Sequence, residues 1–454
     1  MLRAHGPALD NAAAQDFDNG LATALQVALA GPLHAEALTQ ASLGVKEGGL
    51  GVRMASHTLA PAALASRIQA RPLVHHLFRQ LRDLDLAPAD LEDAFDAPAR
   101  AAEEQLRRLL SPSGAARLDL LLREATATSR SATAALLAGR ASPQVSERKP
   151  REAPGMCLVQ QAGREDPEWD CEHGGLQHNL CALVDAERAD ALATSLRAQE
   201  RWADVRRLRC LRDPNNNHDW LWSLNPVYGA IVPPADFGLA VRIRIGAHLV
   251  DDAFVCPRCS TEVVGRTASH ALCCAAPEGT HGHYDARDQL LLSVHLADPS
   301  ATPEAPEIIA SHPALRPADI FTTAAIPGGL AALDVGIASP DAAGAGDDCV
   351  ESMWRKKRGT YAPHFDEMRA FGVTYVPMVI SCYGRWHPES AVTLERICVQ
   401  ASRRLGLADH LPLLRKARAT AGVAIWRRAA AMARACLPRL RPEEMALIFS
   451  EELE

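Results

Sequence analysis

Residues 316–337 read RPADIFTTAAIPGGLAALDVGI, and this stretch decides the interpretation of the second half of the chain. Two runs rich in apolar and β-branched residues, 320–326 and 330–337, flank a Pro-Gly-Gly turn. That pattern predicts a β-hairpin. One aspartate, Asp319, precedes the first run, and another, Asp334, lies in the middle of the second. The hairpin therefore carries two carboxylates whose relative position depends on its register.

Asp334 stands within an apolar run, where an unpaired ionised carboxylate is costly to bury. It needs a cation or a close hydrogen-bond partner. Residues 281–350 hold ten acidic residues against two arginines, so a divalent metal is the economical cation. A symmetric hairpin would pair Asp334 with about Thr323 and leave Asp319 roughly 13 Å along the partner strand. A shared metal therefore requires a bent first strand or an asymmetric loop.

Two lysines, Lys356 and Lys357, follow the acidic pair in a chain that has only five lysines among 48 basic residues. The compact charge of lysine can approach a phosphate or an attacking water in a way that a guanidinium group does not reproduce. We expect Lys357 to face the aspartates, with Lys356 as the alternative. The competing interpretation is a solvated basic turn at residues 355–358.

The length of 454 residues and the 48% hydrophobic content predict two to four domains with real cores. No run of eighteen apolar residues occurs, and the amino terminus lacks the apolar core of a secretory signal. Twelve scattered cysteines favour a reducing compartment. The net charge of −7 argues against a protein that coats nucleic acid, although residues 351–454 carry 17 basic against 11 acidic residues.

The fold class predicted by the periodicity is α+β with several domains. Residues 1–140 and about 176–246 read as helices. Trp202, Trp220 and Trp222 lie in the second block, and we expect them to be core residues rather than a base-stacking platform. After His283 strands and helices mix: we predict strands at 320–326, 330–337 and 373–381, and helices near 285–296, 354–371, 390–405 and 411–435.

A cysteine cluster indicates a structural zinc site. The knuckle Cys256-Pro-Arg-Cys259 is followed by His270 and Cys274, the donor types and number of a tetrahedral Cys3His site. Cys273 competes with Cys274 for the fourth position. Without a metal these cysteines would be ordinary buried residues.

Two other motifs are predicted to have no such role. Cys171, His173, His178 and Cys181 have ligand chemistry, but a helix beginning near Gln177 would spread them over different faces. The motif Leu-Val-Asp-Asp at 249–252 is similar to the paired aspartates of polymerases. We interpret it as a loop before Cys256.

In their order, these features make the chain similar to the C-terminal part of a non-LTR retrotransposon polyprotein with a restriction-enzyme-like endonuclease. The Gly-Gly-Leu-Gly block at 48–51 resembles the segment beyond the polymerase palm, and residues 236–246 resemble the helix before the zinc knuckle. His283-Tyr284-Asp285 resembles the Arg-His-Asn that opens the nuclease. The Pro-Asp element, the strand carboxylate and the Lys-x3-Tyr element correspond to Asp319, Asp334 and Lys357 with Tyr361.

The resemblance implies a domain order. It comprises a helical thumb-like region (1–140), a linker (141–166), a helical linker domain (167–250), a zinc knuckle (251–283), a PD-(D/E)XK-type nuclease with a mixed sheet (284–410) and a helical C-terminal region (411–454). The chain departs from the family pattern in three ways. One residue is inserted into Pro-x-Asp, Gly282 replaces the Arg before His, and Gly336 occupies the lysine position of Asp-x-Lys. The lysine must then come from the following helix. No polymerase palm is present, so no DNA synthesis is expected.

The implied activity is Mg2+-dependent nicking of DNA, which primes reverse transcription by a partner reverse transcriptase. Asp319 and Asp334 would hold the magnesium ion. Glu304 or Glu307 would complete the shell, and we favour Glu307 because it precedes an apolar pair. Lys357 would stabilise the transition state, and Tyr361 would position Lys357. The expected partners are DNA and the RNA of the element, and the expected location is the nucleus. No association with a membrane is expected. The alternatives are an inactive or domesticated nucleic-acid-binding remnant that keeps the zinc site, and a structural interaction protein.

Overall fold

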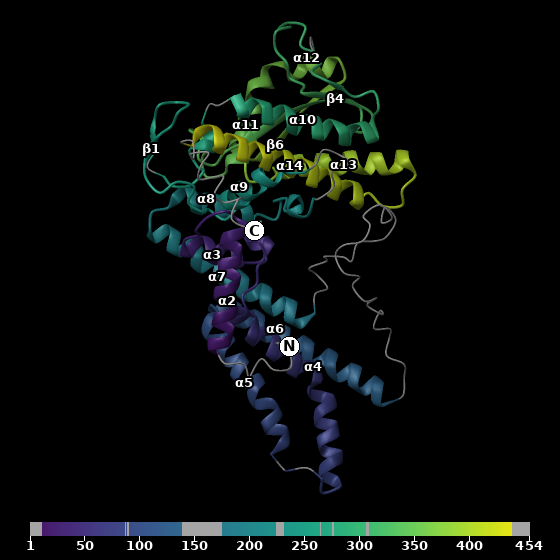
Figure 1. Ribbon diagram of the computed structural model, residues 1–454. Helices are drawn as coiled ribbons and strands as arrows, with labels where there is room; N and C mark the ends of the chain where they lie inside the picture. The colour runs from purple at the N-terminus through teal and green to yellow at the C-terminus, as the bar shows by residue number, and fades with distance from the viewer. Residues whose placement is uncertain are drawn as a thin grey trace, which may run out of the picture. The chain divides into compact units, whose positions relative to one another are not determined.

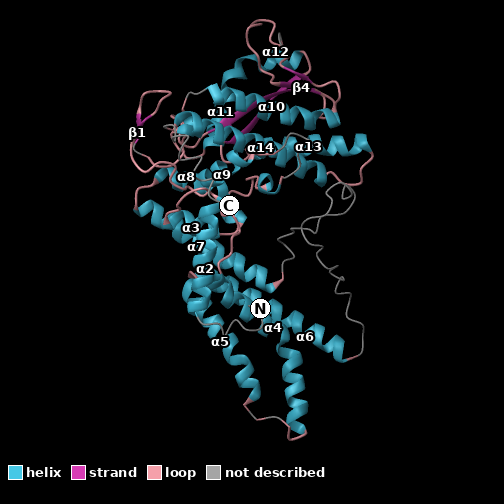
Figure 2. Cartoon of the chain, viewed as in Figure 1, coloured by secondary structure: helices cyan, strands magenta, loops and turns pink. Residues whose placement is uncertain are grey.

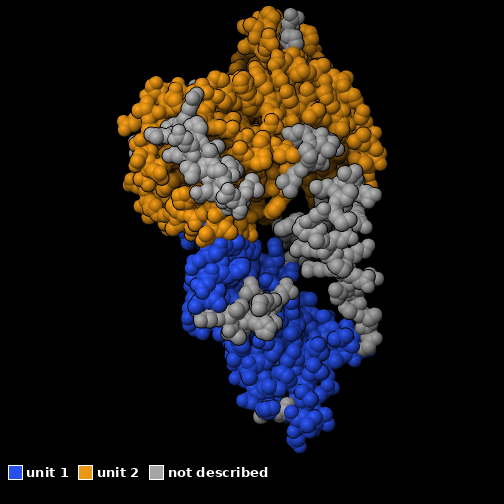
Figure 3. Space-filling view, viewed as in Figure 1, with its two compact units in different colours: residues 1–22, 53–191 blue, residues 23–52, 192–454 orange. Residues whose placement is uncertain are grey.

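The computed structural model describes residues 11–86, 88, 90–138, 175–223, 231–263, 265–274, 277–305 and 308–437. The chain forms two compact units, coloured separately in Figure 3: residues 1–22 with 53–191, and residues 23–52 with 192–454. Helix dominates both, and strands occur in two small sheets of the second unit (Figure 2). The α+β class is therefore confirmed. The predicted linker, 141–166, lies outside the described residues.

The first unit is helical, as the periodicity predicted. It contains most of α2 (Asn11–Ala28), then α4 (Ala55–Asp83), α5 (Leu91–Leu109), α6 (Pro112–Leu137) and most of α7 (Leu176–Ala198). Leu64, Leu106, Leu118 and Leu180 are buried together at its centre. Ser111 fixes the start of α6, because its hydroxyl accepts a hydrogen bond from the backbone N–H of Gly114.

The second unit is the larger, and many of its elements are labelled in Figure 1. Its chain order is α3 (Ala35–Ser42), η2 (Val45–Glu47), α8 (Trp202–Arg212), η3 (Asp219–Trp222), α9 (Pro234–Arg244), β1 (Phe254–Val255), β2 (Glu262–Val263), η5 (Ala271–Cys273), α10 (Pro277–Ala297), β3 (Thr302–Pro303), β4 (Ile320–Thr322), β5 (Leu330–Ala338), α11 (Cys349–Tyr361), η6 (Ala362–His364), α12 (Phe365–Ala370), β6 (Val373–Ser381), α13 (Pro388–Leu405) and α14 (Leu411–Cys436).

The glycine-rich block at 48–51 packs inside this unit. The guanidinium group of the fully buried Arg244, on α9, donates to the backbone carbonyls of Gly49 and Val45. A Cβ atom at Gly49 would lie 2.1 Å from the carbonyl oxygen of Leu43, so only glycine fits there. The conformation of this turn is thus fixed by a charge-assisted contact from a helix about 195 residues away in the sequence.

The larger sheet has the order β3-β4-β5-β6, with two antiparallel pairs and a parallel pair between β5 and β6. Alternate residues of β5 face opposite sides. Leu333 and Val335 join a core formed with α10, α13 and α14, whereas Ala332 packs with Met368 of α12 and Tyr375 of β6. Asp334 belongs to the Ala332 face. Helices thus cover both faces, with the aspartate on the side of α11 and α12.

The hairpin differs from its prediction in length and register. Strand β4 ends at Thr322 rather than at residue 326, and Thr322 pairs with Ala331. The register is shifted by four residues from the symmetric hairpin. The cause lies upstream: a carboxylate oxygen of Asp298, just after α10, accepts hydrogen bonds from both hydroxyls of Thr322 and Thr323 and from the N–H of Thr323. These bonds end the strand early and leave residues 323–329 as an asymmetric loop.

Candidate functional site

The register brings the carboxyl of Asp319, the residue just before β4, near that of Asp334. Ile320 pairs with Leu333, and the N–H of Asp319 donates to the carbonyl of Leu333 at 2.8 Å. The charge of Lys357 acts on both carboxyls, and the charge of Asp319 acts on Asp334. The asymmetric loop that a shared metal requires is therefore present, and the separation of roughly 13 Å that a symmetric hairpin would give does not occur.

Asp334 is 8% exposed and has two close partners. The ammonium group of Lys357 donates to one carboxylate oxygen at 2.6 Å, and the hydroxyl of Tyr375 donates to the other. Burial raises the pKa of Asp334; the charge and hydrogen bond of Lys357 and the bond from Tyr375 oppose this rise, and the charge of Asp319 adds to it. The cation that Asp334 was predicted to require is thus present as Lys357.

Asp319 has a different environment on the same face. Burial alone would raise its pKa, but His283, the backbone N–H of Val335 and the charge of Lys357 together lower it. The imidazole Nε2 of His283 lies 3.5 Å from one carboxylate oxygen, and Val335 donates to the other at 2.7 Å. The two carboxyls therefore have pKa values displaced in opposite directions, a pattern that is frequent at functional sites.

Gly336 makes room for Lys357. It lies two residues beyond Asp334 on the same face of β5, and a Cβ atom there would stand 2.5 Å from Cε of Lys357. Helix α11 brings the lysine to this position and begins at Cys349, because the carboxylate of Asp348 accepts from the N–H groups of Val350 and Glu351. The lysine side chain thus crosses the strand over the glycine to reach the carboxylate.

We expect Gly336→Ala to displace Lys357 from Asp334 without disturbing the opposite face of the sheet. The pKa of Asp334 should rise, because a cation that lowers it moves away. DNA nicking, the activity that the family resemblance implies, should then slow by about tenfold or more. Single-turnover nicking rates at several pH values measure this. A rate equal to that of the unchanged chain would show that the close approach over Gly336 has no role.

The other residues predicted for the site are distributed less closely. Tyr361 packs its ring against Tyr375, with centroids 4.7 Å apart, and donates its hydroxyl to the carbonyl of Arg316. Lys356 is exposed. Glu304 opposes Asp319 through the β3–β4 register but forms ion pairs with Arg287 and Arg316. Glu307, the favoured third carboxylate, lies outside the described residues.

Two members of this cluster were missed as site residues. His283 appeared only as part of a family motif, and Tyr375 as an ordinary residue of a strand. The parallel register pairs Tyr375 with Ala332, two residues from Asp334 on the same face. That register, which the sequence pattern alone does not specify, is the signal that would have identified Tyr375.

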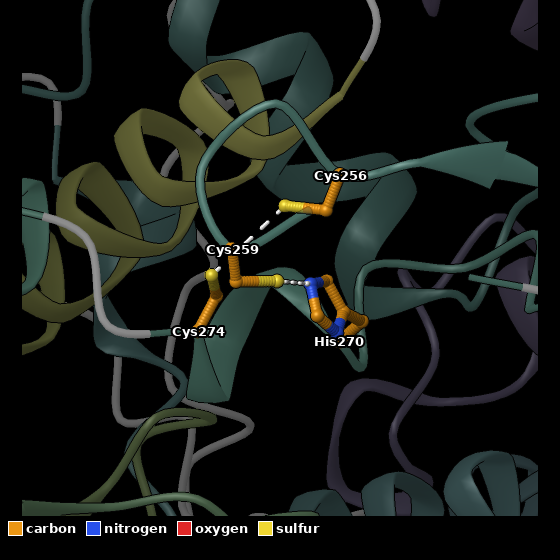
Figure 4. Close-up of side chains that lie close together, drawn as sticks. All are labelled: Cys256, Cys259, His270 and Cys274. Carbon is orange, nitrogen blue, oxygen red and sulfur yellow. Dashed lines mark hydrogen bonds between the residues drawn. The ribbon is translucent and has the colours of Figure 1, made fainter. Parts of the chain in front are cut away.

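The second site is the cysteine–histidine group of the knuckle (Figure 4). Cys256 and Cys259 lie around the turn between β1 and β2, and His270 and Cys274 flank η5. Their ligand atoms all lie within 4.8 Å of one another, so the group could hold a zinc ion. The spread is somewhat wider than the roughly 4 Å expected of a closed tetrahedral site. Cys273 is exposed and directs its thiol to backbone carbonyls, which favours Cys274 as the fourth ligand.

The protonation of the group is uneven. Hydrogen bonds from the side chain and backbone of Thr261 are the main causes that lower the pKa of Cys259, to about 6. Burial raises the pKa of Cys274. Because thiolates are the ligands of zinc, binding of the ion must release protons from this group.

A fifth cysteine, Cys436, lies beside the group. It ends α14, is fully buried, and belongs to the same buried cluster as Cys256 and Cys274. Because Cys436 lies 162 residues after Cys274 in the sequence, the spacing of the knuckle motif did not identify it. The knuckle is thereby packed against the last turn of the C-terminal helix.

The prediction that Cys171, His173, His178 and Cys181 do not form a metal site stays a prediction. Cys171 and His173 lie outside the described residues, whereas His178 and Cys181 lie on α7. Within the described part of the chain, the knuckle is the one group with metal-ligand geometry. Residues 249–252 form a loop before Cys256, as expected.

No protein-family model matches the chain, and no curated protein matches it either. Among the described residues, no helix combines the length and the apolar character needed to cross a membrane.

Proposed function

We propose that the chain is the metal-dependent DNA endonuclease module of a retrotransposon-derived protein. The observation that carries the proposal is the juxtaposition of Asp319, Asp334 and Lys357 on one face of a mixed sheet. The knuckle group and the order of elements, from glycine-rich block to knuckle to sheet, add to the resemblance on which the proposal also depends. DNA, element RNA, a separate reverse transcriptase and a nuclear location belong to the same proposal.

The carboxylates fit a magnesium ion. Mg2+ is usually held by one or two carboxylates together with waters and substrate phosphates. Three of the four carboxylate oxygens of Asp319 and Asp334 accept one hydrogen bond each, and the fourth lies 3.5 Å from the imidazole of His283, so all four retain further acceptor capacity. The two aspartates would therefore hold the ion, which when bound would polarise the phosphate and lower the pKa of a coordinated water.

The remaining residues define what the protein itself contributes to hydrolysis. A water oxygen would form a bond to phosphorus while the bond to the leaving oxygen breaks, and one proton would pass from the water to the leaving group or solvent. Lys357, beside Asp334, would donate to the phosphate oxygens and stabilise their developing charge. His283 and Tyr375 are positioning residues, because Tyr375 donates a hydrogen bond to Asp334 and the imidazole of His283 lies 3.5 Å from Asp319.

The second candidate function is an inactive nucleic-acid-binding remnant. The observation that favours it is the ion pair between Lys357 and Asp334, which compensates the buried carboxylate without a metal. A structural protein would be compensated in the same way. The nuclease, the inactive remnant and the structural protein therefore all agree with this geometry. They differ in their response to Mg2+.

We expect the purified, zinc-loaded chain to convert supercoiled plasmid to the open circle with Mg2+ and not in Mg2+-free buffer without chelator. Thermal unfolding with increasing Mg2+ is the companion measurement, because an ion that binds only the folded state raises its stability. Stabilisation without nicking would favour the inactive remnant. If Mg2+ causes neither stabilisation nor nicking, the result would favour the structural interaction protein.

A further inference from the structure

The second unit contains a cavity of about 600 Å3 beside the knuckle, and neither Asp319, Asp334 nor Lys357 lines it. Its walls come from the segment between α7 and α8, from His34 and His248, and from residues 265–269 of the knuckle. The volume falls within the range of sites that bind small planar ligands. None of its lining residues is used by the proposed nuclease.

Trp202 lies in the wall and is 52% exposed. The expectation that the three clustered tryptophans are core residues holds for Trp220, which is 1% exposed, but is wrong for Trp202 and for Trp222, which is 58% exposed. Trp202 starts α8, so its indole extends from the helix end rather than from a packed face. Large aromatic side chains are usually well buried, and an exposed one in a cavity provides a stacking surface.

A second aromatic element faces the same space. The rings of His34 and His248 stack with centroids 3.9 Å apart and an angle of 15° between their planes. Burial is the main cause that lowers the pKa of His34, to about 4, and it also lowers the pKa of His248. Both rings are thus neutral near pH 7. The Nδ1 atom of His34 is buried and has no hydrogen-bond partner in the part of the chain that the structure describes.

The cavity is lined by three carboxylates, Glu36, Glu200 and Asp204, and by two arginines, Arg201 and Arg266. Arg201 pairs with Asp204 at 2.7 Å and lies 3.9 Å from Glu36. This balance favours an uncharged planar group over an anion. Arg266, on the exposed knuckle loop, supplies a cation suited to a phosphate at the rim. The hydroxyls of Thr267 and Ser269 can exchange hydrogen bonds with the edge of a base.

We propose that this cavity binds an unpaired nucleobase of a single-stranded nucleic acid, which stacks on Trp202. The inference rests on the proposed function only in taking nucleic acid as the partner. Stacking on an aromatic ring tolerates any base, since every base has a π-face. The wall is coupled to the zinc group, because residues 265–269 run between Cys259 and His270 and the carbonyl of Arg266 accepts from the N–H of Leu249 at 2.7 Å.

The test uses the zinc-loaded chain carrying Asp334→Asn, in Mg2+-free buffer, so that cleavage does not interfere. Its affinity is measured by fluorescence anisotropy for labelled oligo(dT) and oligo(rU) of about ten nucleotides and for a duplex of the same length. We expect Trp202→Ala to weaken single-strand binding about tenfold, with little change for the duplex. Trp222→Ala is the matched control, since Trp222 is equally exposed but does not line the cavity, and it should change the affinity less than twofold.

Unchanged single-strand affinity in Trp202→Ala, or an equal loss in Trp222→Ala, would overturn the proposal. So would an equal loss for single strand and duplex, because that result indicates a general contact. Melting temperatures check that Trp202→Ala remains folded, as expected for an exposed side chain. The oligo(dT) and oligo(rU) arms distinguish DNA from RNA as the source of the base. Nicking is measured separately with Mg2+, so the two proposals can fail independently. An absence of nicking would contradict the proposed nuclease and not the base-binding cavity. Nicking together with unchanged single-strand affinity in Trp202→Ala would contradict only the base-binding cavity.

Discussion

Removal of zinc is expected to destabilise the second unit by about 4 kcal/mol when free zinc otherwise exceeds the dissociation constant a thousandfold. The reason is that the four ligand atoms already converge around one point. Cys256 and Cys274 belong to the same buried cluster as Trp220, Trp426 and Cys436. Without the ion, several thiols would share a buried space with no cation. Denaturant unfolding of the metal-loaded and chelator-treated protein measures the difference.

The control for this prediction is provided by adjacent cysteines. Cys256→Ser should reproduce the loss seen on chelation and should abolish stoichiometric zinc binding. Cys273→Ser should change stability by no more than about 0.5 kcal/mol, because Cys273 is exposed and its thiol points to backbone carbonyls. Equal effects of the two substitutions would mean that the ligand set is misassigned.

The elements predicted correctly are those whose signals are local. Strand β6 has the predicted bounds, Val373–Ser381, because a run of β-branched and apolar residues specifies it without help from other segments. The knuckle ligands follow from their spacing in the same way. For α11 the helix was expected near Trp354, but it begins at Cys349, since the cap at Asp348 outweighs the periodicity of the following residues.

The errors came from contacts distant in the sequence. Residues 323–326 have strand character, but Asp298 ends the strand at Thr322 and sets the register that brings the two aspartates near each other. Cys436 and Tyr375 reach their sites from other elements. For Trp202, periodicity could not tell an exposed helix start from a buried face. Local patterns thus specified which residues have ligand chemistry, and tertiary contacts decided which of them meet.

Asp334→Asn should abolish Mg2+-dependent nicking of supercoiled plasmid, and Asp319→Asn should do the same, because each replaces a charged ligand by a neutral amide. Alanine at either position should have the same effect on nicking. The asparagine substitution at Asp334 is the sharper test, since it keeps an acceptor for the hydroxyl of Tyr375 and leaves the side-chain volume nearly unchanged. The stoichiometry of bound zinc should stay constant in all these variants. Residual Mg2+-dependent nicking in Asp334→Asn would remove this carboxylate from the mechanism.

Lys357→Ala should slow nicking by about 10²–10³-fold while weakening DNA binding far less, because its charge would act on the transition state. Lys356→Ala is the control: the residue is adjacent, equally basic and exposed, and the ammonium that contacts Asp334 belongs to Lys357. A pH profile separates this role from a structural one. Because Lys357 lowers the pKa of Asp334, its removal should raise that pKa and move the acid limb of the nicking rate to higher pH. If the acid limb stayed in place and both alanine variants lost activity equally, the lysines would act only as general DNA contacts, and the inactive-remnant interpretation would gain the support that the nuclease loses.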